Sequence, residues 1–255
     1  MRPSVLFGLL ALVLGAGSAC GDDDPMQDGT SATITVALTA EMGAQGRVEM
    51  ESKTFSSPQV TEGFRMSRLS FYLSEIALIE QVNGQDLATD LAEVAYVNFG
   101  PDGTAQLDFQ QVPTGDYQAL RFRLGLSAEQ DATTPADYAQ DSPLGRDSEY
   151  WFDWNSYIFF KVEGRSDTLA DQVSRFEVPF VYHVGRSEQL ARVITVDYPV
   201  TIESSGEVLN LTLDVAQVLG LAANDGVSLA GGLDHANMEA VPLMDRTSTA
   251  FAKTE

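Results

Sequence analysis

The residues with the most specific chemistry in this chain are its two histidines, His183 and His235. His183 lies in the segment F-V-Y-H-V-G, and His235 lies in G-L-D-H-A-N-M. A pair of neutral imidazoles suits copper in its reduced state, which accepts two or three ligands. Because the two residues are far apart in the sequence, only the fold could bring them to one ion. Composition alone favours the other interpretation, in which both are structural histidines with ordinary hydrogen bonds.

Both tryptophans of the chain, Trp151 and Trp154, lie in the aromatic segment Y-W-F-D-W-N-S-Y at residues 150–157. The most common role of such rings is to fill a hydrophobic core. The segment follows a long polar loop, residues 127–146, and loops of that length often carry function. We therefore expect the aromatic segment to form a shaped corner beside the loop, in addition to any contribution to the core.

The long loop also holds four acidic residues whose oxygen atoms would suit calcium. Their spacing does not match the calcium loop D-x-D-x-D-G, so it favours a solvated acidic loop over a calcium site. The four residues are Glu129, Asp131, Asp137 and Asp141.

Motifs of the common enzyme classes are missing from the sequence. It has no G-x-S-x-G nucleophile turn, no H-E-x-x-H motif and no glycine-rich phosphate loop. We expect the protein not to be an enzyme. The alternative is an enzyme that uses His183 as a general base.

The charge balance excludes several partners. The 255 residues include 15 Lys+Arg and 37 Asp+Glu, with a formal net charge of -22. A nucleic-acid site needs a face rich in lysine and arginine, so we expect no nucleic-acid partner. The hydrophobic fraction of 44% is too high for a disordered chain.

The N-terminus has the pattern of a bacterial lipoprotein. Residues 5–16 are almost entirely apolar, and Gly17, Ser18 and Ala19 precede Cys20, the only cysteine. This pattern predicts a signal peptide at residues 1–19 and acylation of Cys20, whereas ordinary cleavage after Ala19 is the alternative. Residues 20–31 are acidic and read as a tether. We expect an extracytoplasmic protein, periplasmic or anchored to the outer membrane, that contacts the membrane through its lipid anchor alone.

Beyond the tether, apolar residues recur with a period of two, which is typical of half-buried strands. Such runs lie at residues 33–38, 68–73, 120–124, 176–184, 194–198 and 209–215. Turn dipeptides separate the runs, and Asn83-Gly84 and Asp102-Gly103 predict tight hairpins. We expect one all-β domain at residues 32–255, an antiparallel β-sandwich of the Ig-like or Greek-key kind with long loops.

Five segments, in the right order, resemble the MbnP-like family of methanobactin-associated copper-binding proteins. The segment W-F-D-W-N-S-Y-I-F-F-K-V-E-G is similar to the family signature W-x-W-x-x-G-Y-x-F-x-x-x-E-G, and F-V-Y-H-V-G is similar to its H-x-G strand. The matching segments are residues 68–79, 112–126, 151–164, 180–185 and 235–238.

The resemblance implies an exported, lipid-anchored β-sandwich that binds copper through two histidines and a kynurenine. The kynurenine forms when a dihaem peroxidase-like partner, of the MbnH type, oxidises a tryptophan. By motif, His183 and His235 stand at the metal-ligand positions, and Trp151 and Trp154 stand at the aromatic signature.

The sequence departs from this family in the loop and in the signature. Residues 127–145 contain no histidine, whereas copper-binding members often carry an Asn-His pair there. Phe152 replaces the first tryptophan of the W-x-W pair, and the glycine before Tyr157 is missing. We expect a copper-binding or copper-handling accessory protein, and the alternative is a metal-free surface or interaction module that keeps the fold but has lost the metal site.

Overall fold

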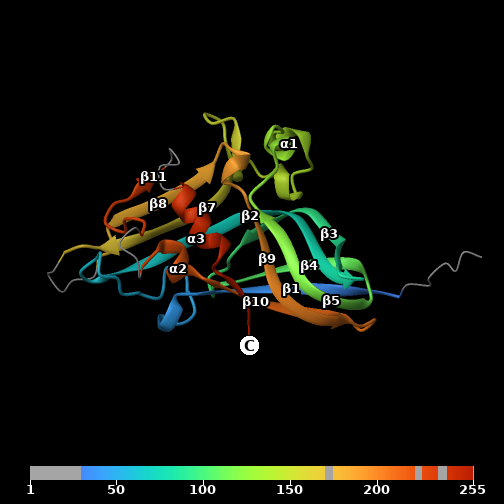
Figure 1. Ribbon diagram of the computed structural model, residues 1–255. Coiled ribbons are helices and arrows are strands. Elements are labelled where there is room, and N and C mark those ends of the chain that lie inside the picture. Colours follow the sequence, from blue (N-terminus) through green and yellow to red (C-terminus); the bar gives the residue numbers. More distant parts are fainter. Residues whose placement is uncertain (1–29, 170–174, 222–225, 235–239, 255) are drawn as a thin grey trace, which may run out of the picture.

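The computed structural model describes residues 30–169, 175–221, 226–234 and 240–254, which form two β-sheets and a few short helices (Figure 1). The strands are β1 Ser31–Glu41, β2 Gly63–Val82, β3 Gln85–Asn98, β4 Thr104–Pro113, β5 Gly115–Leu124, β6 Tyr150–Trp151, β7 Ser156–Asp167, β8 Val178–Gly185, β9 Arg192–Ile202, β10 Glu207–Asp214, β11 Leu233–Asp234 and β12 Phe251–Lys253. The helices are α1 Ala128–Asp131, α2 Val215–Leu219 and α3 Ala240–Ser248, with 3-10 turns η1 Gly43–Gln45, η2 Pro135–Asp137, η3 Pro143–Gly145, η4 Asp147–Glu149 and η5 Glu188–Leu190.

The smaller sheet has the strand order β12-β10-β1-β4. Strand β1 shows why an alternating sequence forms such a sheet, because Ile34, Val36 and Leu38 are buried while the residues between them are more exposed. It pairs antiparallel with β4 and parallel with β10.

The larger sheet has the order β11-β8-β7-β2-β5-β9, with β3 paired to β2 and β6 paired to β7. The 20-residue strand β2 joins its two halves. Residues 63–71 of β2 pair with β7, and residues 73–79 pair with β5. In Figure 1, β7, β8 and β11 lie along the left part of the long strand β2, and β3 and β5 lie toward its right part.

One hydrophobic core lies between the sheets, since buried residues of both belong to the same cluster. Ile34 and Leu211 come from the small sheet, and Phe71, Phe160 and Phe180 come from the large sheet. The rings of Phe71 and Phe160 stack with centroids 5.6 Å apart. Burial of this apolar surface drives the two sheets together, and the predicted all-β sandwich is confirmed.

The two predicted hairpins had different outcomes. Asn83-Gly84 joins the paired strands β2 and β3, with both residues at positive φ, as a tight hairpin requires. The prediction for Asp102-Gly103 is wrong, because this turn connects β3 in the large sheet to β4 in the small sheet. Gly103 is needed there for close packing, since a Cβ would overlap the carbonyl oxygen of Val48.

A second, smaller core lies on the outer face of the large sheet, under the long loop. Its members are Tyr72, Leu126, Leu144, Tyr150, Tyr157 and Phe159. The hydroxyl groups of Tyr72 and Tyr157 donate hydrogen bonds to the carbonyl oxygens of Pro143 and Leu144, and burial raises the pKa of Tyr157 to about 12. The loop is therefore held on the sheet by an aromatic core and by hydrogen bonds.

Two of the four acidic residues of the loop serve its local structure. A side-chain oxygen of Asp137 accepts the backbone N–H of Thr134, which stabilises η2, and Asp131 accepts the N–H of Tyr157 at the start of β7. Among the described residues, no three or more histidine, cysteine, aspartate or glutamate side chains are grouped as a metal site.

The predicted signal peptide, nearly all of the tether and Cys20 lie outside the described residues. Within the described ranges, no helix combines the length and the apolar character needed to cross a lipid bilayer.

Candidate functional site

His183 lies on the outer face of the large sheet, the face turned away from the main core. Its neighbours in β8, Tyr182 and Val184, belong to the main core, so alternation directs His183 to the opposite side. The side chain is only 11% exposed, and the residue pairs across the strands with Lys161 of β7. The period of two in residues 176–184 thus places His183 on the face opposite the aromatic residues of its strand.

The imidazole of His183 contacts a carboxylate on the neighbouring strand. Its Nε2 lies 2.7 Å from Oε1 of Glu163, which is two residues beyond Lys161 on the same face of β7. This hydrogen bond holds the pKa of Glu163 below its ordinary value. Glu163 is therefore ionised at neutral pH, and its oxygen accepts the hydrogen bond.

The two tryptophans lie beside His183 on the hairpin formed by β6 and β7. The ring of Trp151 meets the imidazole of His183 edge to face, with centroids 5.8 Å apart. The ring of Trp154 stacks on the ring of Trp151, with a centroid distance of 5.2 Å and an interplanar angle of 23°. The turn is closed by a 3.0 Å hydrogen bond from the N–H of Trp154 to the carbonyl of Trp151, so the aromatic segment forms an ordered corner.

Two residues at the end of β8 hold this hairpin in place. Gly185 allows a close approach, because a Cβ there would overlap the carbonyl oxygen of Tyr157 and lie 3.2 Å from the ring of Trp154. The guanidinium of Arg186 lies 5.7 Å from the centroid of Trp154, within the range of a cation–π contact. The position of the tryptophans is thus coupled to the strand that carries His183.

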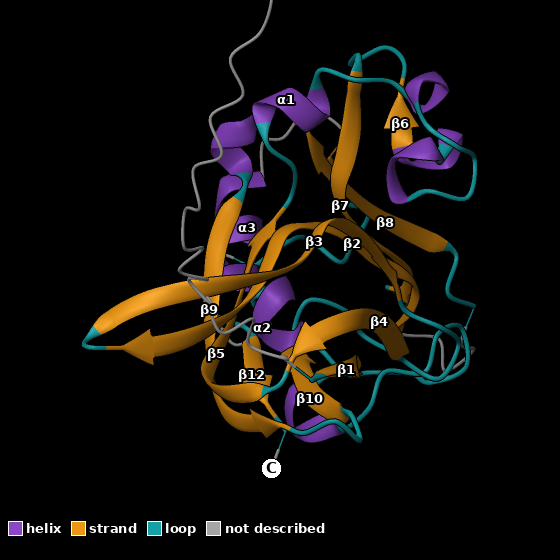
Figure 2. Cartoon of the chain, turned by 90° about the vertical axis from the view of Figure 1, so that its right-hand side faces the viewer, coloured by secondary structure: helices purple, strands orange, loops and turns teal. Residues whose placement is uncertain are grey.

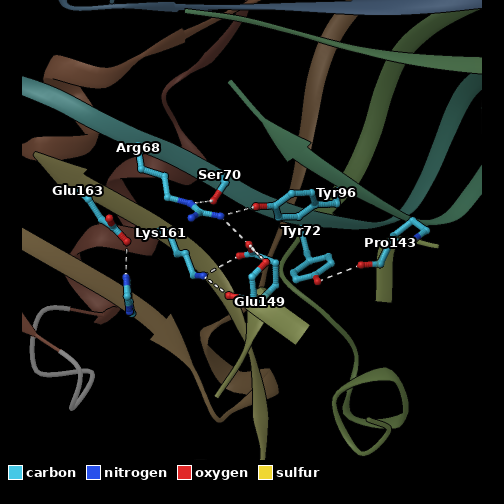
Figure 3. A network of polar contacts seen from close by, with 10 residues as sticks. Arg68, Ser70, Tyr72, Tyr96, Pro143, Glu149, Lys161 and Glu163 are labelled. Atoms are coloured by element: carbon cyan, nitrogen blue, oxygen red, sulfur yellow. Dashed lines mark hydrogen bonds and ion pairs between the residues drawn. The ribbon is translucent and has the colours of Figure 1, made fainter. Parts of the chain in front are cut away.

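A buried ionic cluster fixes the segment that leads into the hairpin. Figure 3 shows Glu149 between Arg68 and Lys161, with Oε1 of Glu149 2.6 Å from Arg68 and Oε2 2.8 Å from Lys161. The side chains of Glu149 and Lys161 are only 2% and 5% exposed. Burial lowers the pKa of Lys161, whereas its contact with Glu149 acts in the opposite direction. Because Glu149 immediately precedes β6, this cluster anchors the strand that carries Trp151.

His235 lies outside the described residues, and the distance between the two histidines is not defined by them. The described chain reaches the residue before it, Asp234, in β11. Strand β11 pairs parallel with β8, with Leu233 opposite Val181 and Asp234 opposite Tyr182. In the sequence, His183 directly follows Tyr182, and His235 directly follows Asp234. Tyr182 and Asp234 are backbone partners in the pairing of β8 with β11.

The structure brings together three of the residues expected at the site: His183, Trp151 and Trp154. Sequence reasoning did not identify the charged residues around them, which are Arg68, Glu149, Lys161 and Glu163. The sequence does indicate two of them. Lys161 and Glu163 alternate with Phe160 and Val162, which are buried. This alternation marks a polar outer face on β7. Figure 2 shows β6 and β7 at the end of the molecule away from β1 and β10.

Comparison with known proteins gives one family. The family model of MbnP matches residues 31–239. Among solved structures, MbnP from Methylosinus trichosporium is similar, with a TM-score of 0.49 and 11% sequence identity over 83% of this chain and 87% of that chain. A search of curated proteins gave no match. The resemblance seen in the sequence is confirmed, and since the family model covers far more than half of its length, the chain belongs to the MbnP family.

Proposed function

We propose that this protein is an extracytoplasmic, non-catalytic accessory protein that binds or handles copper at the outer face of its large sheet. His183 and His235 are the proposed ligands. Family membership supports the proposal, because the copper chemistry that the sequence resemblance implies is a property of MbnP-like proteins.

The observation that carries the proposal is the parallel pairing of β11 with β8. Asp234 and Tyr182 are partners in this pairing, and each is followed directly by a histidine in the sequence. Two histidines that are far apart in the sequence thus each directly follow one member of a backbone pair. This pairing supports the proposal that the two residues share one ion.

The chemistry of the described donor fits copper. Metal-binding histidines usually donate their other ring N–H to a carboxylate or carbonyl, which fixes the orientation of the ring. Glu163 is such a carboxylate for His183, at 2.7 Å. Reduced copper prefers nitrogen and sulfur donors, and when bound it would supply a redox-active centre beside two indole rings.

We propose further that Trp151 is the tryptophan that a dihaem peroxidase-like partner converts to kynurenine. Trp151 contacts the imidazole of His183 directly, and Trp154 stacks on Trp151. Of the two, Trp151 is therefore the one whose ring contacts a proposed ligand. The proposed anchor, acylated Cys20, is supported by the signal pattern that precedes it.

Metal analysis of the purified protein tests the copper proposal. The protein is loaded with Cu(I) under reducing conditions and dialysed, and the bound metal is measured by atomic emission. We expect retention of one copper ion per chain in the wild type and its loss in His183→Ala and in His235→Ala. Retention that neither substitution changes would indicate binding by surface carboxylates and would contradict the proposal.

One observation favours the alternative, a metal-free interaction module. Phe152, at the tip of the β6–β7 hairpin, is 72% exposed, and exposed aromatic side chains are frequent anchors in protein interfaces. This alternative predicts that Phe152→Ala abolishes binding of a partner protein while neither histidine substitution has any effect on it.

A further inference from the structure

The contact between Glu163 and His183 determines which nitrogen of the imidazole can bind a metal ion. The atom of His183 that lies 2.7 Å from Oε1 of Glu163 is Nε2. An ionised carboxylate can only accept hydrogen bonds, so Nε2 must carry the proton. In a neutral imidazole the other nitrogen, Nδ1, is then unprotonated, and an unprotonated ring nitrogen is the atom that binds a metal ion.

We propose that Glu163 is a positioning residue that keeps the proton of His183 on Nε2 and so makes Nδ1 the copper-binding atom. The identity of the ion rests on the function proposed above. The position of the proton does not, because it belongs to the metal-free protein.

The surrounding strands explain why Glu163 can serve His183. On β2, Arg68 is the backbone partner of Glu163, and on β7, Lys161 is two residues away on the same face. Both cations make their ion pairs with Glu149. Glu149 therefore pairs with the two neighbouring cations, while the carboxylate of Glu163 accepts a hydrogen bond from the imidazole N–H.

The cations still act on Glu163 at longer range. Arg68 on β2 and Lys161 on β7 are positively charged neighbours of this carboxylate, and a nearby positive charge favours the ionised form of a carboxyl group. In its ionised form Glu163 can only accept hydrogen bonds. The ionic cluster and the imidazole are in this way parts of one polar network on the outer face of the sheet.

The first test is the tautomer of His183 in the metal-free wild-type protein, which needs no substitution. Two-dimensional ¹H–¹⁵N correlation spectra of the imidazole distinguish a protonated from an unprotonated ring nitrogen, and the His235→Ala spectrum assigns the signals of His183. We expect a protonated Nε2 and an unprotonated Nδ1. The opposite tautomer in the wild type would overturn the proposal.

Two variants connect this tautomer to Glu163. In Glu163→Ala we expect the strong preference for the Nε2–H form to disappear, whereas in Glu177→Gln, which removes an exposed carboxylate just before β8, it should remain. If Glu163→Ala does not fold, Glu163→Gln keeps the volume of the side chain and an oxygen that accepts the same N–H, and it should retain the tautomer. An unchanged preference in a folded Glu163→Ala protein would show that Glu163 does not set it.

The last test uses Cu(I), which is diamagnetic and leaves the NMR signals observable. We expect the Nδ1 resonance of His183 to shift on addition of Cu(I), with the Nε2 proton retained, and an affinity about 10–100-fold weaker in Glu163→Ala. A shift of Nε2 with loss of its proton would overturn the inference and leave the copper function intact. If Cu(I) does not bind at all, the proposed function fails, while the tautomer result stands.

Discussion

The carboxylate of Asp131 accepts a hydrogen bond from the backbone N–H of Tyr157, with Oδ1 and N 2.9 Å apart. Asp131 ends α1 in the long loop, and Tyr157 is the second residue of β7. The same carboxylate accepts a hydrogen bond from the hydroxyl group of Ser156. This contact ties the loop to the hairpin that holds Trp151 and Trp154, and it uses the oxygens that a calcium site would require.

The environment of Asp131 predicts a pH dependence of stability. Burial raises its pKa above the ordinary value of 3.8, against the effect of the two hydrogen bonds. A carboxyl group with a raised pKa in the folded state contributes most to stability below its unfolded pKa, and the contribution falls as the pH rises through the folded value. Relative to Asp131→Asn, the wild type should therefore be more stable at about pH 4 than at pH 7.

Urea unfolding of both proteins across this range measures the difference. The control is Asp141→Asn, which removes an exposed carboxylate of the same loop and should show no such trend. If the difference in free energy of unfolding between the wild type and Asp131→Asn is the same at every pH, the pKa of Asp131 is not raised in the folded state.

Removal of the buried carboxylate of Glu149 should destabilise the protein strongly. In Glu149→Ala the cations of Arg68 and Lys161 lose their shared partner, and an uncompensated buried charge typically costs about 3–5 kcal/mol. Chemical unfolding gives this value. Glu129→Ala, at an exposed position of the same loop, serves as the control and should have little effect.

A second substitution separates charge from packing. Lys161→Met in the Glu149→Ala background removes one of the two unpaired cations, so it should recover part of the lost stability. If Glu149→Ala is no less stable than Glu129→Ala, the ionic cluster does not hold the loop.

Oxidation should be specific to one of the two stacked tryptophans. When the protein is produced with a dihaem peroxidase-class partner, we expect the intact mass to rise by one oxygen atom less one carbon atom, the change from tryptophan to kynurenine. Trp154→Phe should keep this change, and Trp151→Phe should lose it, because Trp151 is the ring that contacts His183. The opposite pattern would assign the modification to Trp154.

Much of the fold follows from the period of two in the sequence. Alternation in segments such as residues 33–38 places Ile34, Val36 and Leu38 in the core, and the same rule puts His183 on the outer face. Alternation does not say which strands become neighbours. The parallel pairs β1–β10 and β8–β11, and the connection between sheets at Asp102-Gly103, depend on long-range packing that no local pattern encodes.

The candidate site likewise has features that follow from the local sequence and features that depend on long-range packing. The aromatic corner could be expected from the density of rings at residues 150–157, because both tryptophans lie within one turn of chain. The pairing of Glu149 with Lys161 could not, since in so acidic a sequence one glutamate looks like any other. Its importance comes from burial, which depends on how the loop folds over the sheet.

Joint binding of one copper ion by His183 and His235 is tested most directly by a competition titration of Cu(I) with a chromophoric chelator. The titration is done on the wild type, His183→Ala, His235→Ala and the double variant. If the two imidazoles share an ion, the wild type binds one equivalent, and each single substitution lowers the affinity about as much as both together. Additive losses, or a single variant that binds as tightly as the wild type, would contradict a shared site.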